Sequence, residues 1–370
     1  MNERATIQAG DAYGTHRALE PKGALPQPAL RVDNDFSRLF RGEVLLSVET
    51  LNIDAASFTQ MEQQGDPTAI VLRTVAERGK QHNPVTGSGG MLLGRVVQVA
   101  EGRPAESGPG APGETLAPGD KVATLVSLSL TPLRIDRVRA VRPASAQMDV
   151  DGEAVLFGSG AYARLPPDLP ERLALAVLDV AGAAPQVARL VKPGVVVTVL
   201  GAGGKSGILC VAEARRRVEA GGGAGASASV GGKGGASAFI VGLEASPRAA
   251  EELRALGLCD AVVAADARDP VAVRDAVLKA TGGRESDVTF SCVNVPDAEL
   301  GAILATRDRG IVYFFAMSTS FTKAALGAEG VGKDVDLFIG NGYARGHAEH
   351  SLAMMREMPA IRALFEKRYG

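Results

Sequence analysis

The sequence predicts a two-domain α/β protein, in which a β-rich domain precedes a doubly wound parallel sheet. Short segments in the first half of the chain alternate apolar and polar residues, as half-buried strands do. From residue 195 onward, β-branched runs alternate with helical patterns, which is typical of successive βαβ units. The chain has 370 residues, of which 46% are hydrophobic, and this is enough for two cores.

Composition argues against several classes of partner and site. Lysine and arginine total 40 and aspartate and glutamate total 42, so a net charge of −2 points to neither a nucleic acid nor a membrane. No apolar run approaches the roughly 20 residues of a membrane helix, and the N-terminus lacks a signal-peptide core, so we expect a cytoplasmic protein. The three cysteines lack CxxC spacing and indicate small core residues rather than a structural zinc site.

The first domain is expected over residues 1–170. Residues 1–40 contain three prolines and predict an irregular arm or cap. Alternating apolar and polar residues predict strands over 43–52, 92–100 and 120–130, with a turn-rich loop before the last of them. Apolar residues at helical spacing over 173–190 predict a helix that leads into the second domain.

The second domain opens with VVVTVLGAGGKSG at residues 195–207. A buried strand, a glycine turn and a helix over 206–217 form the first half of a βαβ unit, and the next strand, 239–243, ends at Glu244. Backbone N–H groups at the start of such a helix can hold a diphosphate, and an acid at the end of the second strand can bind a ribose hydroxyl. The sequence therefore predicts a dinucleotide site.

The same glycines also suggest a P-loop, because Gly204, Lys205 and Ser206 spell its closing GKS. That fingerprint fails, since position 199 is valine where it needs glycine. The spacing of Gly201, Gly204 and Gly207 is GxxGxxG rather than the strict GxGxxG, because residue 206 is serine.

The rest of the domain alternates helices and strands. Helices are expected over 248–256, 270–280 and 300–305, and strands over 261–263, 287–292, 311–315 and 335–339. Ligands of such sheets bind at the carboxyl ends of the strands. The glycine-rich stretch 219–236 is expected to be a flexible surface loop on the other side of the sheet.

Several segments resemble a known family. The β-rich first domain with GDKV, the nucleotide fingerprint and the last helix resemble the medium-chain dehydrogenase/reductase superfamily. More specifically, LGAGGKSG, HNPVTGSGGMLLG, VSLSLTPL and the run from CVNVPDAELG to FIGNGY resemble the L-erythro-3,5-diaminohexanoate dehydrogenase family of lysine degradation. The resemblance covers nearly the whole chain, with the glycine-rich stretch and the proline-rich arm as departures.

The resemblance implies an architecture and a reaction. The implied architecture is a GroES-like catalytic domain (1–170), a Rossmann NAD-binding domain (171–344) and a helical segment (345–370) that returns to the catalytic domain. The implied reaction is oxidative deamination of L-erythro-3,5-diaminohexanoate by NAD⁺ and water, giving 5-amino-3-oxohexanoate, ammonia and NADH, in a cleft between the domains.

The expected cofactor is NAD. Glu244 would accept a hydrogen bond from the 2′-hydroxyl and repel the 2′-phosphate of NADP, although Arg248 follows nearby. The expected cofactor-binding residues lie at the carboxyl ends of the strands. They are Gly201, Gly203, Gly204, Lys205, Ser206, Gly207, Glu244, Val293, Asn294, Ala316 and Ser318.

No metal is expected. Where zinc-dependent relatives carry their ligands, this chain has Asp54, Ser88, Gly89 and Asp179, and its four histidines form no ligand set. Asp54 and Asp179 are the candidate catalytic residues, because an amine must lose a proton before hydride loss and the iminium cation needs nearby negative charge. The alternative for each is a turn or helix-cap role.

Further residues are candidates for substrate binding. Lys323 suits the substrate carboxylate, with a solvated surface lysine as the alternative. Asn52, Ser57 and Ser88 offer hydrogen bonds, and Asn341 and Tyr343 follow a strand's carboxyl end. The HAEH string from His347 to His350 is expected to have a capping and surface role.

Two other functions remain open at this point. One is a zinc-independent NAD(P)H-dependent quinone or enone reductase, and the other is a dinucleotide-binding protein without turnover. The expected partner is a small diamino acid. The strands over 311–315 and 335–339 come late in the sheet order, so a homodimer or a dimer of dimers is expected through this edge.

Overall fold

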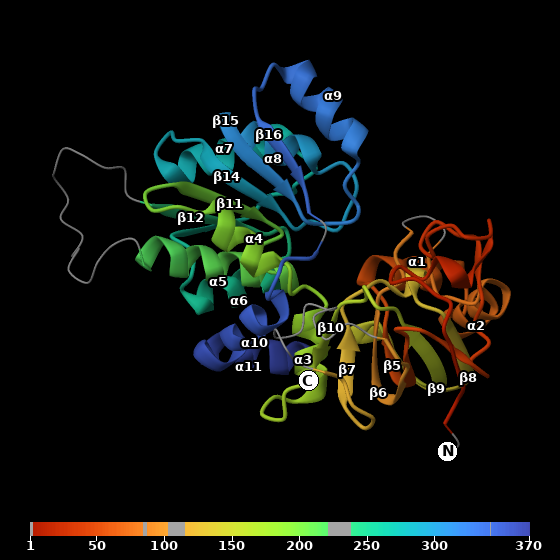
Figure 1. The fold of residues 1–370 in the computed structure, drawn as a ribbon. Helices are drawn as coiled ribbons and strands as arrows, with labels where there is room; N and C mark the ends of the chain where they lie inside the picture. The colour runs from red at the N-terminus through yellow and green to blue at the C-terminus, as the bar shows by residue number, and fades with distance from the viewer. Residues whose placement is uncertain (1–2, 84–86, 103–114, 221–237, 341) are drawn as a thin grey trace. The chain divides into compact units, whose positions relative to one another are not determined.

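The structure is a computed structural model, and it describes residues 3–83, 87–102, 115–220, 238–340 and 342–370 (Figure 1). The chain divides into two units, Met1–Asp179 with Glu366–Gly370, and Val180–Phe365. The expected boundary at residue 170 falls before helix α3 (Glu171–Leu178), which belongs to the first unit. Lys121 pairs with Glu171, and Asp179 accepts a hydrogen bond from Asn52, so both ends of α3 bond within that unit.

The first unit is built on a six-stranded antiparallel sheet in the order β10-β7-β6-β5-β9-β8. The six strands of this sheet are β5 (Val44–Asn52), β6 (Met91–Val99), β7 (Lys121–Thr124), β8 (Leu133–Arg142), β9 (Gln147–Leu156) and β10 (Tyr162–Arg164). Two further pairs of short strands precede them: β1 (Thr6–Ile7) with β4 (Leu39–Phe40), and β2 (Ala18–Glu20) with β3 (Arg31–Val32). Besides α3, its helices are α1 (Ala55–Gln64) and α2 (Pro67–Arg78), with 3₁₀ turns at Thr15–Arg17, Leu128–Leu130 and Pro143–Ser145.

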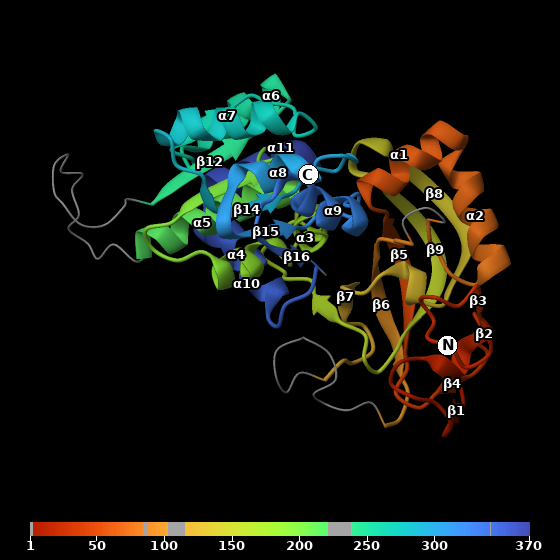
Figure 2. The same cartoon turned by 90° about the horizontal axis from the view of Figure 1, so that it is seen from above.

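The alternation in β5 separates two cores. Leu46 and Val48 pack in a cluster with Phe58 of α1 and Val75 of α2, so these helices cover one face of the sheet (Figure 2). Leu45 lies in a second cluster with residues of the N-terminal arm and of β9. Both faces of β5 are therefore covered, which the single alternating pattern predicts only in part.

The N-terminal arm is held by a buried ion pair. Arg17 is fully buried and donates to both carboxylate oxygens of Glu43, at 2.6 Å from Nε and 2.8 Å from Nη2. Its remaining N–H groups reach the carbonyl oxygens of Asp35 and Arg38. Burial acts to raise the pKa of Glu43, but hydrogen bonds from Arg17 and His16 outweigh it, so this pKa lies below its usual value. The arm is thus an integral layer of the first unit.

The second unit is a parallel six-stranded sheet in the order β13-β12-β11-β14-β15-β16. Strands β12 and β13 are added on one side of β11, and β14, β15 and β16 are added on the other, so the strand order reverses between β11 and β14. Its strands are β11 (Val196–Leu200), β12 (Phe239–Leu243), β13 (Ala261–Val263), β14 (Ser286–Ser291), β15 (Thr306–Phe314) and β16 (Asp336–Ile339). Its helices are α4 (Ala183–Leu190), α5 (Lys205–Ala220), α6 (Pro247–Leu256), α7 (Pro270–Thr281), α8 (Glu299–Ala305), α9 (Phe321–Val331), α10 (His347–Glu357) and α11 (Pro359–Tyr369).

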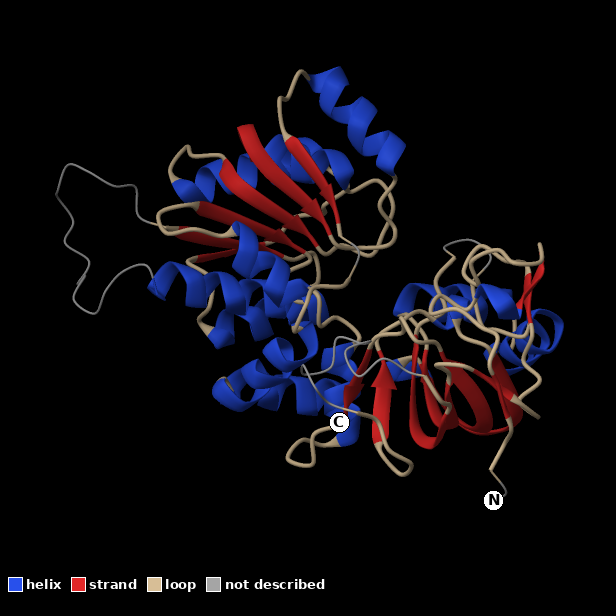
Figure 3. Ribbon diagram, viewed as in Figure 1, coloured by secondary structure: helices blue, strands red, loops and turns tan. Residues whose placement is uncertain are grey.

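Helices cover both faces of this sheet. Residues of α7, α8 and α9 share one core cluster with β11, β12 and β15. Figures 1 and 3 show α4 and α5 on the face opposite α7 and α8. Helix α10 joins α4 and α5, since Ser351 donates to the carbonyl of Ala181 and His350 lies 3.1 Å from Glu213. Residues 345–365 therefore belong to the second unit, and only Glu366–Gly370 group with the first.

Three sequence expectations need correction. The helix expected over 173–190 is two helices, α3 and α4, and at Gly182 a Cβ would lie 2.2 Å from the carbonyl oxygen of Gly342. The strand expected over 120–130 ends at Thr124 and is followed by a 3₁₀ turn. His347 is buried against the ring of Tyr343 rather than at the surface, and Gly346 is the N-cap of α10.

The glycine-rich stretch lies almost entirely outside the described residues, since α5 ends at Ala220 and the description resumes at residue 238. In the described part of the chain, no single helix is long and apolar enough to cross a bilayer. Helices α3 and α4 would be so by length and composition only if they are taken together as one broken span.

Replacing Arg17 with methionine is expected to destabilise the first unit by about 3–5 kcal/mol, because it leaves the Glu43 carboxylate buried without its cation. Urea unfolding measures this loss. The matched control is Arg137→Met, which removes an exposed pair with Asp151 and should cost at most about 1 kcal/mol. Equal losses in the two variants would contradict the role given to Arg17.

The same pair gives a pH dependence. Because the pKa of Glu43 is lower in the folded state than in the unfolded state, its stabilisation is present above the unfolded-state pKa and is lost as the pH falls through the folded-state value. Wild-type stability should therefore decline more steeply on acidification than that of Glu43→Gln. Parallel stability curves for the two proteins would rule out this contribution.

Candidate active site

The glycine turn between β11 and α5 is shaped by close backbone contacts. Gly201 has φ +71°, which favours glycine, and a Cβ there would lie 3.1 Å from the carbonyl of Cys292. A Cβ at Gly207 would lie 2.1 Å from the carbonyl oxygen of Gly201, so α5 can sit this close to the strand only with glycine there. At Gly203 a Cβ would lie 2.8 Å from Ala249, whereas Gly204 is exposed and uncrowded. The crowded glycines are thus 201, 203 and 207.

Glu244 closes this turn from the end of β12. Its Oε2 accepts from the backbone N–H of Gly203 at 3.0 Å, and its Oε1 accepts from that of Ser246 at 2.9 Å. The carbonyl of Leu243 accepts from the N–H groups of Gly201 and Ala202. The predicted ribose acid is therefore fixed against the predicted diphosphate turn, and it stays half-buried.

Neighbouring strands bring their carboxyl ends to the same edge. Val293 follows β14 and its N–H lies near Gly201, while the Ser318 hydroxyl after β15 donates to the carbonyl of Val293 at 3.1 Å. Asn294 is exposed and Ala316 is half-buried in these loops. Lys205 and Ser206 begin α5 and are half-buried. The structure therefore gathers all the predicted cofactor residues at the carboxyl edge around the point where the strand order reverses.

These residues fit a dinucleotide. Glycine at 201, 203 and 207 lets the turn pack closely against its neighbours, and the turn leads into the N-terminus of α5, where N–H groups and the helix dipole favour phosphate. An acid stands at the end of the second strand, which is the ribose position in this fold. Arg248, the nearest following cation, is directed to Glu252 at 3.6 Å.

In the first unit, Asp179 ends a buried chain of amide hydrogen bonds. Gln147 Nε2 donates to Asn52 Oδ1 at 3.1 Å, and Asn52 Nδ2 donates to Asp179 Oδ1 at 3.0 Å. Asn52 and Gln147 are buried and face each other across β5 and β9. This chain fixes the orientation of the Asp179 carboxylate, as a base held in position requires.

Asp54 has a different setting. It is the N-cap of α1, and its Oδ1 accepts from the N–H of Ser57 at 2.8 Å. Its Oδ2 is buried and has no hydrogen-bond partner among the residues that the structure describes. The cap role is therefore real, but it uses only one of the two oxygens. The other oxygen receives no hydrogen bond from the described residues.

The remaining substrate candidates are dispersed. Ser57 is part of α1 and accepts from the Asn83 side-chain amide, and the Ser88 carbonyl accepts from the Asn83 backbone N–H, so Asn83 links the two serines. In the second unit, exposed Lys323 is paired with Asp297, which raises the pKa of the lysine and compensates its charge. Tyr343 accepts from Gln186 through its carbonyl oxygen. Asn341 lies outside the described residues.

The described residues contain no group of three or more His, Cys, Asp or Glu side chains placed to hold a metal ion. Of the residues at the zinc-ligand positions of the resembled superfamily, Asp54 caps α1 and Asp179 is bonded to Asn52. At Gly89 a Cβ would lie 2.4 Å from the backbone nitrogen of Ser129, which explains the glycine there.

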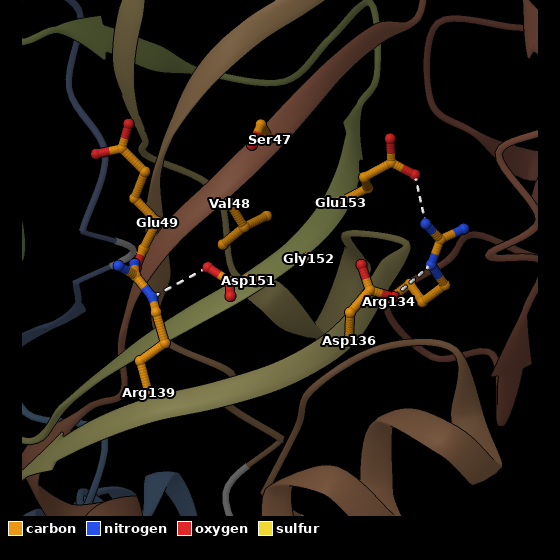
Figure 4. A pocket seen from close by; sticks show the side chains of 9 residues that line it. All are labelled: Ser47, Val48, Glu49, Arg134, Asp136, Arg139, Asp151, Gly152 and Glu153. Carbon is orange, nitrogen blue, oxygen red and sulfur yellow. Dashed lines mark hydrogen bonds and ion pairs between the residues drawn. The ribbon is translucent and has the colours of Figure 1, made fainter. Parts of the chain in front are cut away.

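A hollow of about 520 Å³ lies elsewhere on the first unit, against β5, β8 and β9 (Figure 4). Arg139 pairs with Asp151 at 3.0 Å, and Arg134 pairs with Glu153 at 2.7 Å. Glu49, at its rim, pairs with Lys121 at 2.8 Å. Because these charges already compensate one another and no predicted site residue lines the hollow, we do not assign the active site to it.

Sequence reasoning missed the polar residues that surround the two aspartates. The sequence does not mark Gln147, because only the pairing register of β5 and β9 brings it opposite Asn52. Gln81, His82 and Asn83 lie in a segment without regular structure, so no periodicity marks them. The available signal is a polar run two residues before TGSGG, the stretch that holds Ser88 and Gly89.

The chain is similar in sequence to proteins of one family. The model of the L-erythro-3,5-diaminohexanoate dehydrogenase N-terminal domain matches residues 16–166. An L-erythro-3,5-diaminohexanoate dehydrogenase of Acetoanaerobium sticklandii is 49% identical over 97% of this chain and 99% of its own. One of Fusobacterium nucleatum is 46% identical over 98% and 100%, respectively.

Among solved structures, an alcohol dehydrogenase of Thermotoga maritima has a TM-score of 0.54 at 15% identity, covering 88% of this chain and 84% of its own. A mycobacterial protein solved with NADPH also scores 0.54, at 14% identity over 88% and 89%. Identities this low show the fold alone.

The fold, with its Rossmann-type parallel sheet, is shared with these dehydrogenase structures. The two relatives at 49% and 46% identity are dehydrogenases, so the class of protein is an oxidoreductase that uses a nicotinamide dinucleotide. Within that class, the chain belongs to the L-erythro-3,5-diaminohexanoate dehydrogenase family. The expected fold class and the expected family are both confirmed.

Gly203→Ala is expected to weaken NADH binding at least tenfold, because the new methyl group meets both Ala249 and the Glu244 carboxylate. Enhancement of NADH fluorescence on binding measures the dissociation constant. Gly330→Ala in α9 is the control, since nothing lies within 4 Å of its Cβ position, and it should bind NADH as the wild type does. Unchanged affinity in Gly203→Ala would contradict the assigned cradle.

Proposed function

We propose that this protein catalyses the oxidative deamination of L-erythro-3,5-diaminohexanoate by NAD⁺ and water, releasing 5-amino-3-oxohexanoate, ammonia and NADH, in lysine fermentation. The observation that carries this proposal is identity of 49% and 46%, over almost the entire chain, to two dehydrogenases named for that substrate. The glycine cradle and the two aspartates of the first unit supply the groups that such a reaction requires.

On the cofactor side, Gly201, Gly203, Gly207 and the first turn of α5 would hold the diphosphate, and Glu244 the adenosine ribose. When bound, the nicotinamide ring accepts the hydride. NAD is proposed over NADP because Glu244 adds negative charge where a 2′-phosphate would sit. Arg248 is 78% exposed at its side chain and already faces Glu252, which leaves the carboxylate as the dominant charge there.

On the substrate side, we assign the base to Asp179. The 3-amino group must be neutral before its carbon loses hydride, and a carboxylate fixed by Asn52 can accept that proton. Once that proton has passed on to water, the restored negative charge of Asp179 can stabilise the iminium cation that follows. Asn52 and Gln147 act through Asp179 by fixing its orientation.

We propose hydrogen-bonding roles for the other candidate residues. Ser57 and Ser88 would offer hydrogen bonds from the α1 side, while Tyr343 and Asn341 would do so from the second unit. Lys323 fits the substrate carboxylate less well than the sequence indicates, because Asp297 already compensates its charge. Lys323 could bind the substrate carboxylate only after its ion pair with Asp297 had opened.

A homodimer is proposed through β16. This strand is the last in the sheet order, and its Phe338 and Ile339 side chains are 37% and 61% exposed. An apolar edge strand with open backbone groups favours pairing with the same strand of a second copy.

The cofactor proposal is tested with Glu244→Gln. The wild type should reduce NAD⁺ with a much higher kcat/KM than NADP⁺, and the variant should lose at least tenfold of that preference, because the amide removes the negative charge. Absorbance of NADH or NADPH gives both rates. A wild type that uses both cofactors equally would refute the assignment of Glu244.

The base is tested with Asp179→Asn. Loss of the proton acceptor should lower kcat by about 10²–10⁴ while substrate KM changes little. The control is Asp120→Asn, which removes a carboxylate paired with Arg164 in the same unit and should leave kcat unchanged. A variant with normal kcat and an intact circular dichroism spectrum would remove Asp179 from the mechanism.

A further inference from the structure

Buried polar atoms without partners gather in one region of the first unit. Six buried side-chain nitrogen or oxygen atoms of the described residues make no hydrogen bond, and four of them belong to three residues: Asp54 (Oδ2), Gln81 (Oε1 and Nε2) and His82 (Nδ1). Gln81 is completely buried. An unsatisfied buried polar atom costs about 1–3 kcal/mol, so such a concentration indicates a ligand that completes the bonding.

Hydrogen bonds connect the segment that holds Gln81 and His82 to helix α1, which Asp54 caps. Asn83, directly after His82, donates from its amide to Ser57 Oγ at 2.9 Å and to Gln60 Oε1 at 2.8 Å, both on α1. Asp54 caps that same helix and is bonded to Ser57. The segment 81–83 therefore runs along the first turns of α1, at the end where the open Asp54 oxygen lies.

The returning chain closes the region from the other side. A Cβ at Gly90 would lie 2.1 Å from the carbonyl oxygen of Asn52, and one at Gly89 would lie 2.5 Å from that of Gln81. The backbone of the glycine pair thus packs between the end of β5 and the Gln81 segment. We call Asp54, Gln81 and His82 the open polar cluster.

The open polar cluster carries a negative charge that no described residue compensates with an ion pair. Asp54 forms no ion pair with any described residue. The nearby cation Lys80 is committed elsewhere, because its Nζ donates to the carbonyl oxygens of Pro26 at 2.6 Å and Gln27 at 2.9 Å. Burial, and then the charges of Lys80 and Arg78, lower the pKa of His82, so its ring is neutral and adds no positive charge. A cationic ligand with N–H donors fits this cluster.

We propose that Asp54 and Gln81 bind the 5-ammonium group of the substrate, which makes them the residues that determine specificity for a diamino acid. This inference rests on the proposed function. A glutamine amide accepts hydrogen bonds but does not titrate, so it suits an amine that stays charged throughout the reaction. The 3-amino group, by contrast, must lose its proton and leave. The structure thereby divides the two aspartates, with Asp54 for the spectator amine and Asp179 for the reacting one.

When a site is built to hydrogen-bond a polar group of its ligand, it discriminates strongly against a ligand without that group, because the buried groups of the site are then left unpaired. The wild type should therefore turn over 3-aminohexanoate, which lacks the 5-amino group, with a kcat/KM at least about 10³ below that for L-erythro-3,5-diaminohexanoate.

The test compares Asp54→Asn and Gln81→Met on these two substrates. Asparagine also caps helices, so the first variant keeps the bond to Ser57 and removes only the charge. Each variant should raise KM for the diamino acid tenfold or more with little change in kcat, and should leave kcat/KM for 3-aminohexanoate unchanged. Discrimination between the two substrates should fall accordingly.

Two matched controls separate this result from a change in stability. Asp66→Asn alters the corresponding cap of α2, where the side chain accepts from Thr68. Gln98→Met removes an amide that bonds only the backbone of Arg4. Both should keep wild-type discrimination. Affinity for the diamino acid in the presence of NADH, measured by calorimetry, should fall in the two test variants and not in these controls.

Each outcome bears on one proposal. If the wild type does not oxidise L-erythro-3,5-diaminohexanoate, the proposed function is wrong. If it does so but both variants keep wild-type discrimination, the assignment of Asp54 and Gln81 is wrong. If Asp54→Asn instead loses kcat equally on both substrates, Asp54 acts on the reacting amine, and the division of roles is overturned.

Discussion

The close seating of α5 on β11 is the constraint on which the nucleotide edge depends. Because Gly207 has no side chain, the first turn of α5 lies against the carbonyl of Gly201, and Gly201 in turn approaches the chain that follows β14. Glu244 then reaches the N–H of Gly203 across the turn. One set of backbone contacts thus fixes the helix N-terminus, the ribose acid and the loop after β14 together. The parallel sheet supplies the rigid base for this arrangement.

In the proposed reaction, the first unit would bind the two amino groups of one substrate with two different aspartates. The two aspartates lie at the ends of β5 and of α3, but their surroundings differ. Asp179 is oriented by the buried amides of Asn52 and Gln147, whereas Asp54 keeps an oxygen without a partner beside Gln81. A fixed carboxylate suits proton transfer, and an open one suits binding of a lasting cation.

Much of the fold could be predicted from the sequence, and the reasons are local. The β-branched run before the glycine turn, the acid after the next strand and the regular alternation that follows each depend on neighbouring residues. The strands β11 to β16 lie close to the expected ranges, except that β15 begins at Thr306 rather than at residue 311. The break between α3 and α4 was missed because it reflects the approach of distant Gly342 to Gly182. The arm was predicted as irregular, since the Arg17–Glu43 pair is a tertiary contact.

The candidate site divides in the same way. The cofactor residues follow from one continuous motif and from strand ends, and the structure gathers them. Asp54 and Asp179 could be singled out by position, but their different roles depend on Gln147 and Gln81, which come from other elements and carry no pattern of their own. The measurement that tests the account most directly is the ratio of ammonia released to NADH formed by the wild-type protein acting on L-erythro-3,5-diaminohexanoate. Our account predicts one ammonia for each NADH. NADH without ammonia, or no NADH at all, would contradict it.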